Sequence, residues 1–423
     1  MRILLINYHY FIHGGPDRYF FNIKEALEER GHTIIPFCFD YDETFPTPYR
    51  HFFPEPITGR GPSLLAEQNL NLMMKAKGAA RMFHNPEVER LFRQVVRECS
   101  PDLVYSIYLS SSMLPKILKI AKQEFRLPVL YRLSDYHMLC GSYLFFRDGN
   151  VCQECLNKQG ALIANRCMQG SGPASLLRYL QMRYIKLMAW YDWVDSFLCP
   201  SQFMCRQLIE HAGIQKQKVQ HLPTFAPDLL MNSTQSKSSD YILFFGKVSP
   251  EKGVETLLRA YNRLNIRRLG LKLKLVGKVS DEYKGKLYSF LDEDHRKSVL
   301  ITGPMHGEAL WECVRGAKFV VQPALWFENM PNTILESMSA AKPIIASNLG
   351  SLPELVRDGK NGVLVPPGDT EEFAKTIETL AISDTLIRSM SEASRLFYLQ
   401  DHTREVHLES LLKTMEHQVR ANQ

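Results

Sequence analysis

The sequence KFVVQPALWFENMPNTILESMSAAKPIIAS, residues 318–347, indicates the fold most directly. KFVVQP (318–323) and PIIAS (343–347) are short apolar runs typical of buried strands, and residues 333–341 between them have the apolar spacing of a helix. The loop before this helix contains Pro331, which sets the entry, and asparagines that can cap the first turn. Two strands joined through a helix predict a βαβ unit with parallel strands.

Apolar runs alternate with amphipathic stretches along nearly the whole chain. The first series of predicted strands is RILLIN (2–7), TIIPFCF (33–39), DLVYSI (102–107), PVLYRL (128–133) and SFLCPS (196–201). The second series is YILFFG (241–246), LKLKLVG (271–277), SVLITG (298–303), KFVVQP, PIIAS and GVLV (362–365). This alternation predicts an α/β fold with two doubly wound, Rossmann-like domains.

A proline-containing and serine-rich stretch, residues 223–240, separates the two series and is the expected linker. We therefore predict a first domain over residues 1–225, with a cysteine-rich insertion at about 138–170, and a second domain over 240–400. The last segment, 401–423, has a helical pattern and could pack back on the first domain.

Size and composition exclude several classes of protein. The chain has 423 residues, of which 45% are hydrophobic and 23% charged, so we expect a globular protein. Lysine and arginine exceed aspartate and glutamate by only six scattered charges, which argues against a nucleic-acid partner. The N-terminus lacks the apolar core and cleavage site of a secretory signal, and no run approaches a membrane span. These features predict a cytoplasmic protein.

Two lysines follow the first strand of the second series. In FFGKVSPEKGVETLL (244–258), Lys247 and Lys252 lie between a strand end and a helix that begins near Val254. Free backbone N–H groups and the helix dipole favour anions at such a position, so the two lysines could bind a diphosphate. The alternative is that both lysines are ordinary solvated loop residues.

Two glutamates flank the start of the helix in the opening stretch. Glu328 precedes the proline and lies on the loop, whereas Glu336 lies about one turn inside the helix. This separation would let the two carboxylates contact different parts of one extended ligand. Alternatively, Glu328 is a loop carboxylate and Glu336 a helix-surface residue without a ligand.

The first domain contains a glycine pair and a cysteine pattern. Gly14 and Gly15 follow the first strand and permit close backbone approach to a ligand, although an ordinary βα turn would also explain them. Four cysteines are spaced C-x11-C-x2-C-x11-C, a pattern that fits a structural zinc site without an open position for catalysis. Free thiols or a disulfide are the alternatives. The four residues are Cys140, Cys152, Cys155 and Cys167.

The order of several short motifs adds a resemblance to a known family. GKVSPEKG, the two glutamates spaced E-x7-E, PIIAS, GSLPELV and NGVLVPPGD occur in sequence, and together they resemble the family 4 retaining glycosyltransferases of GT-B fold. The resemblance is dense over residues 240–385 and weaker before them. It implies two domains facing each other across a cleft, and transfer of a hexosyl-type sugar from a UDP- or GDP-sugar to a hydroxyl acceptor. The implied acceptor is a surface polysaccharide or a lipid-linked glycan, and no cofactor is required for catalysis.

The resemblance also implies roles for individual residues. Lys247 and Lys252 would bind the diphosphate, Glu336 the ribose hydroxyls, and catalytic Glu328 would support the positive charge that develops on the sugar. The remaining donor-binding positions implied are Gly14 and Gly15 near the diphosphate, Gly277 and Met305 near the base, and the backbone of Asn329, Met330 and Pro331 at the sugar.

The chain departs from the family at one position in the first domain. The family carries a His-Asp pair after the strand at 128–133, but this chain has Ser134 and Asp135, and the nearest histidine is His137. We expect Asp135 to keep a catalytic place and leave open whether His137 replaces the missing histidine.

Two further segments bear on contact with a membrane. The helical stretches 64–83 and 174–194 mix cations with apolar residues, and could either pack against the rest of the protein or rest on the inner face of a membrane.

The sequence leaves two alternative functions open: a GT-B sugar-nucleotide epimerase, and a degenerate transferase without catalytic activity.

Overall fold

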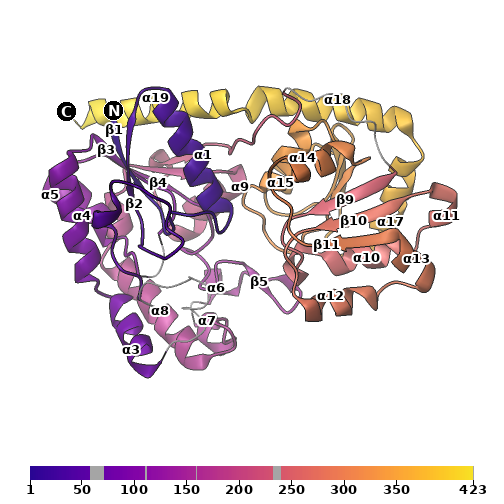
Figure 1. Ribbon diagram of the computed structural model, residues 1–423. Coiled ribbons are helices and arrows are strands. Elements are labelled where there is room, and N and C mark those ends of the chain that lie inside the picture. The colour runs from indigo at the N-terminus through magenta and orange to yellow at the C-terminus, as the bar shows by residue number, and fades with distance from the viewer. Residues whose placement is uncertain (58–70, 110–111, 159, 232–239, 423) are drawn as a thin grey trace.

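The computed structural model describes residues 1–57, 71–109, 112–158, 160–231 and 240–422. Figure 1 shows two α/β domains side by side, with the C-terminal helices running along both of them. Part of the expected linker (232–239) and the beginning of the predicted helix at 64–83 (64–70) lie outside the described residues.

The first domain contains a six-stranded parallel sheet with the strand order β2-β1-β3-β4-β7-β8. Its strands are β1 (Arg2–Ile6), β2 (Thr33–Phe37), β3 (Leu103–Ser106), β4 (Val129–Arg132), β7 (Ser196–Cys199) and β8 (Val219–His221). Its longer helices are α1 (Gly15–Glu29), α3 (Leu72–Arg81), α4 (Pro86–Cys99), α5 (Lys116–Phe125), α8 (Gly172–Leu187) and α9 (Gln202–Gln207). The five strands predicted from the sequence are present; β8 was not predicted, because a three-residue, half-buried VQH segment lacks an apolar run.

The cysteine-rich insertion forms a small unit of its own between β4 and α8. It contains the two-stranded antiparallel ribbon β5 (Phe146–Arg147) and β6 (Asn150–Val151), and the short helices α6 (Glu154–Asn157) and α7 (Ala161–Ala164). In Figure 1 these elements lie below the main sheet of the first domain, and the β5 ribbon reaches towards the second domain.

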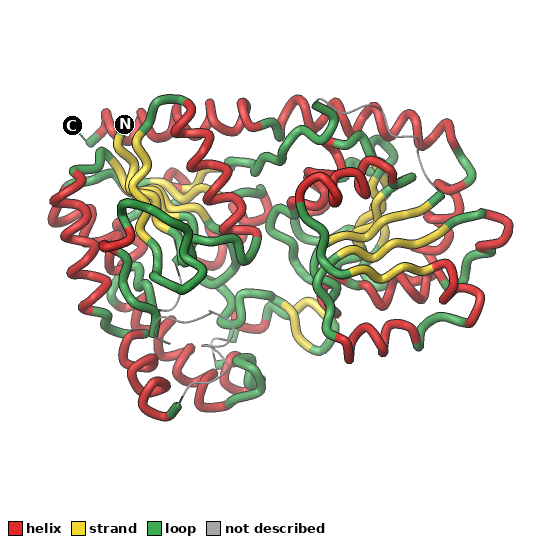
Figure 2. The backbone as a smooth tube through the Cα atoms, in the orientation of Figure 1, coloured by secondary structure: helices red, strands yellow, loops and turns green. Residues whose placement is uncertain are grey.

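The second domain contains another six-stranded parallel sheet, ordered β11-β10-β9-β12-β13-β14. Its strands are β9 (Tyr241–Phe245), β10 (Lys272–Val276), β11 (Val299–Thr302), β12 (Val320–Gln322), β13 (Ile344–Ser347) and β14 (Gly362–Val365). The helices are α10 (Val254–Tyr261), α11 (Ile266–Leu269), α12 (Asp281–Tyr288), α13 (Glu293–Ser298), α14 (Gly307–Gly316), α15 (Asn332–Ser339), α16 (Leu352–Leu355), α17 (Thr370–Ala381) and α18 (Asp384–Asp401). All six predicted strands are present, and the βαβ unit predicted from residues 318–347 is β12-α15-β13. Figure 2 shows the strands of both domains as two separate sheets.

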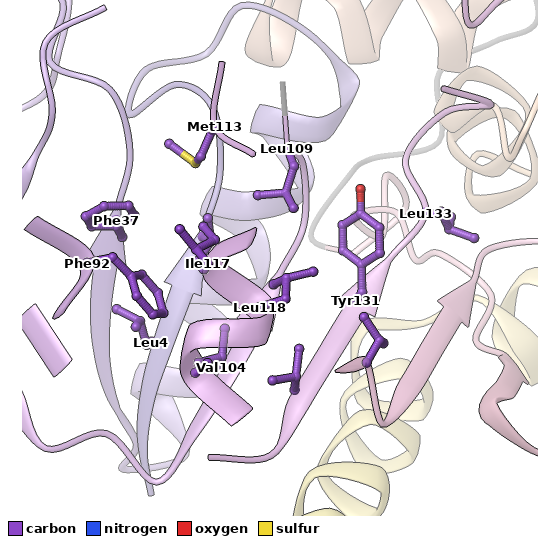
Figure 3. Close-up of a cluster of buried hydrophobic side chains, with 14 of the residues drawn as sticks. Leu4, Phe37, Phe92, Val104, Leu109, Met113, Ile117, Leu118, Tyr131 and Leu133 are labelled. Carbon is purple, nitrogen blue, oxygen red and sulfur yellow. The ribbon is translucent and has the colours of Figure 1, made fainter. Parts of the chain in front are cut away.

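Each face of the first sheet is covered by helices. Successive residues of a strand point to opposite faces, so Leu4 of β1 joins one hydrophobic cluster and Leu5 joins the other. Figure 3 shows the first of these clusters, in which Phe92 of α4 and Leu118 of α5 lie against the strands. Burial on both faces explains why these strands are continuous apolar runs and not alternating ones.

The last helix, α19 (Arg404–Ala421), packs on α1 of the first domain. Its buried side chains include Leu408, Leu411 and Met415, which join the hydrophobic cluster under α1. His407 is fully enclosed beside them: Nδ1 lies 2.6 Å from the carbonyl oxygen of Pro223, and Nε2 lies 2.8 Å from the hydroxyl of Tyr19. Because the carbonyl can only accept, Nδ1 carries the proton and Nε2 accepts from Tyr19.

The burial of His407 predicts acid sensitivity. Burial lowers the pKa of His407 from its ordinary 6.5 to about 3. The unfolded chain therefore binds the proton first, so the stability that neutral His407 contributes is complete above pH 6.5 and is lost as the pH falls towards 3. We expect a loss of about 2 kcal/mol at pH 5 from this residue. Urea unfolding of the wild type and His407→Gln at pH 7 and pH 5 measures it: the wild type should lose more stability than the variant, and equal losses would contradict the assignment.

Candidate active site between the two domains

Glu328 lies on the loop between β12 and α15, with only 6% of the residue exposed. Its Oε1 accepts a hydrogen bond of 2.6 Å from Lys252 Nζ, and that ammonium group also lies 4.7 Å from the centre of the Trp326 ring. The backbone carbonyl of Glu328 accepts from Ser351 Oγ at 2.8 Å and, from the first domain, from Tyr136 OH at 3.2 Å. The loop is therefore held by both domains, and its carboxylate has a fixed cation beside it.

Glu336 points from α15 towards the first domain and is 3% exposed. Its Oε1 accepts a hydrogen bond of 3.0 Å from Arg18 Nη1 of α1. Burial raises the pKa of the Glu336 carboxyl, and the positive charge of Arg18 opposes that rise. A cavity of only about 10 Å³ remains beside this pair.

Two further contacts join the domains around the same loop. Asn329 Nδ2 donates to the carbonyl oxygen of Leu133 at 2.9 Å. Glu354 of the second domain accepts from the backbone N–H groups of Gln202 and Phe203 at 2.7 and 2.6 Å, and so caps α9 of the first domain. An acidic cap at a helix N-terminus is stabilising, because it satisfies free donors and opposes the helix dipole.

The predicted donor-binding glycines have different surroundings in the two domains. A Cβ added at Gly15 would meet no other group within 4 Å, so neighbouring atoms do not demand a glycine there and the space beside it is open. The Gly14 N–H donates to Asp17 Oδ2 at 2.9 Å, which fixes the turn into α1. In contrast, Gly277 at the end of β10 has φ +155°, and a Cβ there would lie 1.7 Å from the carbonyl oxygen of Gly246.

The other predicted donor-binding residues of the second domain lie around these strand ends. Lys247 extends into solvent and pairs with Glu251 at 3.1 Å. Unlike Lys252, it does not contact Glu328. Met305 packs, partly buried, against a cluster that includes Phe245 and Val276. Met330 and Pro331 are placed by the same loop as Glu328, and Met330 packs on the cluster around α15.

The Asp135 side chain is paired with His137. Its carboxylate forms a close contact with His137 Nδ1 and accepts the His137 backbone N–H at 2.9 Å. Burial alone would raise the pKa of Asp135, but its pairing with His137 holds that pKa below the ordinary value. Ser134, at the position where the family has histidine, donates its hydroxyl to the carbonyl of Ile107 at 2.7 Å. Asp135 and His137 line a separate cavity within the first domain.

Arg18, Tyr136 and Glu354 link the domains at the site, and none of them was predicted from the sequence. Arg18 lies on the first turn of α1, three residues after the glycine pair, and this position was the only signal for it. Tyr136 and Glu354 lie within the motifs RLSDYHMLC (132–140) and GSLPELV (350–356). No local pattern in these motifs shows that a side chain will cross to another domain.

The four cysteines of the predicted zinc site lie in or beside the insertion as free thiols. Burial first, and then the neighbouring thiols Cys140, Cys167 and Cys152, together raise the pKa of Cys155 to about 12. The four sulfur atoms are therefore close enough to influence one another. Nevertheless, among the residues that the structure describes, no three His, Cys, Asp or Glu side chains are arranged to hold a metal ion.

None of the helices in the described ranges has both the length and the apolar character needed to cross a membrane.

Comparison with known proteins relates this geometry to a family. Residues 239–383 match the model of the glycosyl transferases group 1. This match lies within the second domain. An uncharacterized glycosyltransferase of Methanocaldococcus jannaschii is 25% identical over 249 residues, which are 56% of this chain and 66% of that protein. The chain spans 33–66% of the length of three curated relatives that it matches.

Solved glycosyltransferase structures match the whole described architecture. The sucrose-phosphate synthase of Thermosynechococcus elongatus has a TM-score of 0.69 at 17% identity, over 99% of both chains. HepE of Anabaena, solved in complex with UDP and glucose, has a TM-score of 0.64 at 17% identity, over 98% of this chain and 99% of that one. The predicted GT-B fold is therefore confirmed.

Proposed function

We propose that this group 1 protein is a retaining glycosyltransferase that moves a sugar from a nucleotide-diphosphate donor to a hydroxyl acceptor in glycan or polysaccharide synthesis. The observation that carries the proposal is the buried Glu328, held 2.6 Å from Lys252 on a loop that both domains fix. A preorganised carboxylate beside a cation suits a reaction in which positive charge develops on a sugar and negative charge on a departing diphosphate.

The proposed reaction exchanges one bond for another at the anomeric carbon. The bond from this carbon to the diphosphate oxygen breaks as the bond to the acceptor oxygen forms on the same face of the sugar. The acceptor proton passes to the departing diphosphate. Lys252 and Lys247 supply positive charge to that leaving group, and Glu328 lies ready to support the sugar.

The donor nucleotide is proposed to bind around Glu336. Its carboxylate suits the two hydroxyls of a ribose, but Arg18 now pairs with it and leaves only a small cavity. Donor binding therefore requires Arg18 to turn away or the domains to separate. The complex of HepE with UDP and glucose makes a UDP-sugar the first donor to test.

A thermal-shift panel of UDP, GDP and their sugars tests the donor site. A nucleotide at 100 times its dissociation constant stabilises the native state by about 2.7 kcal/mol, so the true donor should raise the melting temperature by several degrees. Glu336→Ala should abolish most of that shift, whereas Glu293→Gln, which alters an exposed glutamate paired with Lys297, should keep it. If no nucleotide raises the melting temperature of the wild type, the proposal fails.

We also propose that Cys140, Cys152, Cys155 and Cys167 bind a structural zinc ion. The set of four thiolate donors and its position on a small insertion support this, although the thiols would have to close together from their present arrangement. Metal analysis should find one zinc per chain. Zinc-free protein with an unchanged melting temperature would overturn the proposal.

A further inference from the structure

A phenylalanine of the second domain is buried in the hydrophobic core of the first. Phe327 directly precedes Glu328 on the loop between β12 and α15, and it is 7% exposed. Its side chain joins the hydrophobic cluster on one face of the first sheet, the cluster that contains Phe92 and Leu118. Because protein cores are close-packed, a ring buried in another domain has few alternative positions and restrains the backbone that carries it.

Three aromatic side chains of the first domain surround Phe327. The centre of the Phe203 ring lies 4.7 Å from that of Phe327, and the centre of the Phe145 ring lies 5.9 Å from it, with the two ring planes at 77°. Tyr136 contacts the other two rings, with centres 5.1 Å from Phe145 and 6.3 Å from Phe203. Tilted rings at such separations are the arrangement that aromatic pairs prefer. We call Tyr136, Phe145 and Phe203 the aromatic pocket.

The aromatic pocket also holds the backbone of Glu328. Tyr136 donates its hydroxyl to the Glu328 carbonyl oxygen at 3.2 Å, so one side chain contacts both the pocket and the Glu328 loop. Within the second domain, a Cβ added at Gly350 would lie 3.2 Å from the Phe327 ring and 3.3 Å from the Phe327 Cα. Phe327 is therefore confined between the pocket and the backbone of its own domain, and the Glu328 backbone cannot shift far unless the ring moves with it.

One member of the aromatic pocket comes from the cysteine-rich insertion. Phe145 lies between Cys140 and Cys152 in the sequence, its carbonyl oxygen accepts the Cys152 N–H at 2.8 Å, and the strand β5 that follows it reaches towards the second domain in Figure 1. The φ angle of Phe145 is +50°, in the left-handed region that is costly for a bulky residue, and the residue is 1% exposed. Such a conformation persists only where the surrounding structure imposes it, and it is concentrated at functional sites. The insertion thus places Phe145 against the loop that carries Glu328.

We propose that Phe327 and the aromatic pocket are positioning residues for the transfer reaction: they set where the Glu328 carboxylate lies, and the insertion takes part through Phe145. The inference rests on the proposed transferase function and deepens it. Phe327 acts through Glu328, and a displacement of about 1 Å at a reacting group can slow a reaction about 10²-fold. Glu336 lies on α15, which packs on a different hydrophobic cluster, so donor binding should not depend on the pocket.

Transfer rates of Phe327→Leu and Phe145→Leu, alone and combined with Glu328→Gln, test the proposal. The assay measures release of the nucleoside diphosphate from the sugar nucleotide that the thermal-shift panel selects, with a lipid extract as acceptor. Each single variant should lower kcat about tenfold or more and keep the nucleotide-induced thermal shift. In the Glu328→Gln background the same change should lower kcat by less than about twofold, because residues that act as one unit are not additive.

Two further variants distinguish positioning from general destabilisation. Tyr136→Phe keeps the ring and removes only the hydroxyl that contacts the Glu328 carbonyl, and it should lower kcat about threefold or more. Phe373→Leu alters a fully buried phenylalanine in the core of the second domain, outside the aromatic pocket, and should keep kcat within about twofold of the wild type.

The outcomes separate this inference from the proposed function. Equal reductions of kcat by Phe327→Leu in the wild-type and Glu328→Gln backgrounds would overturn the inference, because the ring would then act independently of the carboxylate. Unchanged kcat in Tyr136→Phe would also overturn it, even if Phe327→Leu fails to fold. Wild-type protein that releases no nucleoside diphosphate would refute the proposed function and this inference together. Slow transfer by Glu328→Gln with unchanged rates in the pocket variants would refute the positioning role alone.

Discussion

Replacement of Glu328 by glutamine should lower the rate of sugar transfer by about 10²–10³-fold. The side chain is buried, its carboxylate contacts Lys252 at 2.6 Å, and its backbone is held by Ser351 and Tyr136. Glutamine keeps the shape but removes the negative charge that is proposed to support the sugar as the leaving group departs. The loss should therefore appear in kcat, measured as release of the nucleoside diphosphate in the presence of acceptor.

Two control measurements distinguish a loss of catalysis from a loss of donor binding or of folding. The nucleotide-induced thermal shift should persist in Glu328→Gln, because the ribose site at Glu336 is untouched. The surface variant Glu293→Gln should retain transfer within about twofold of the wild type, since exposed ion pairs contribute little. Full activity of Glu328→Gln would show that the carboxylate has no catalytic role.

Replacement of Gly277 by alanine should cost at least about 4 kcal/mol of unfolding free energy. Gly277 has φ +155°, a conformation unfavourable for a residue with a side chain, and the new Cβ would lie 1.7 Å from the carbonyl oxygen of Gly246. Since the opposing atom is backbone at the end of the neighbouring strand, β9 and β10 would have to separate. Urea unfolding followed by circular dichroism should show a destabilised second domain or no soluble protein.

Gly285 provides the matched control for this change. It lies inside α12, and an added Cβ would meet no group outside the helix within 4 Å. Alanine there should be neutral or stabilising by about 0.5–1 kcal/mol. Equal unfolding free energies for Gly277→Ala and Gly285→Ala would contradict the close approach of Gly277 to the carbonyl oxygen of Gly246. The contrast also means that loss of donor binding in Gly277→Ala would report folding and not a contact with the base.

Much of the fold could be predicted from the sequence because buried parallel strands are continuous apolar runs. β12, α15 and β13 could be located from residues 318–347 alone, since both strands are apolar and Pro331 marks the helix entry. The strand β8 could not, because three half-buried residues on the edge of a sheet leave no comparable pattern.

The candidate site was predictable only within each domain. Glu328 and Lys252 lie in one domain, and each was assigned to the site from its own motif, but the partner of Glu336 is Arg18, more than 300 positions away. Contacts of this kind depend on how the two domains meet, which no local spacing encodes. Asp135 illustrates the same limit: its place after β4 was predictable, but its orientation towards His137 and the cavity was not.

Proton NMR of the purified protein, incubated with a panel of UDP- and GDP-sugars first alone and then with a lipid extract as acceptor, distinguishes a retaining transferase from an epimerase. A transferase should leave every sugar nucleotide unchanged without acceptor. With the extract, the nucleoside diphosphate should be released and a glycoside should appear with the anomeric configuration of the donor. Interconversion of one sugar nucleotide into another without acceptor would instead identify an epimerase and contradict the proposed function.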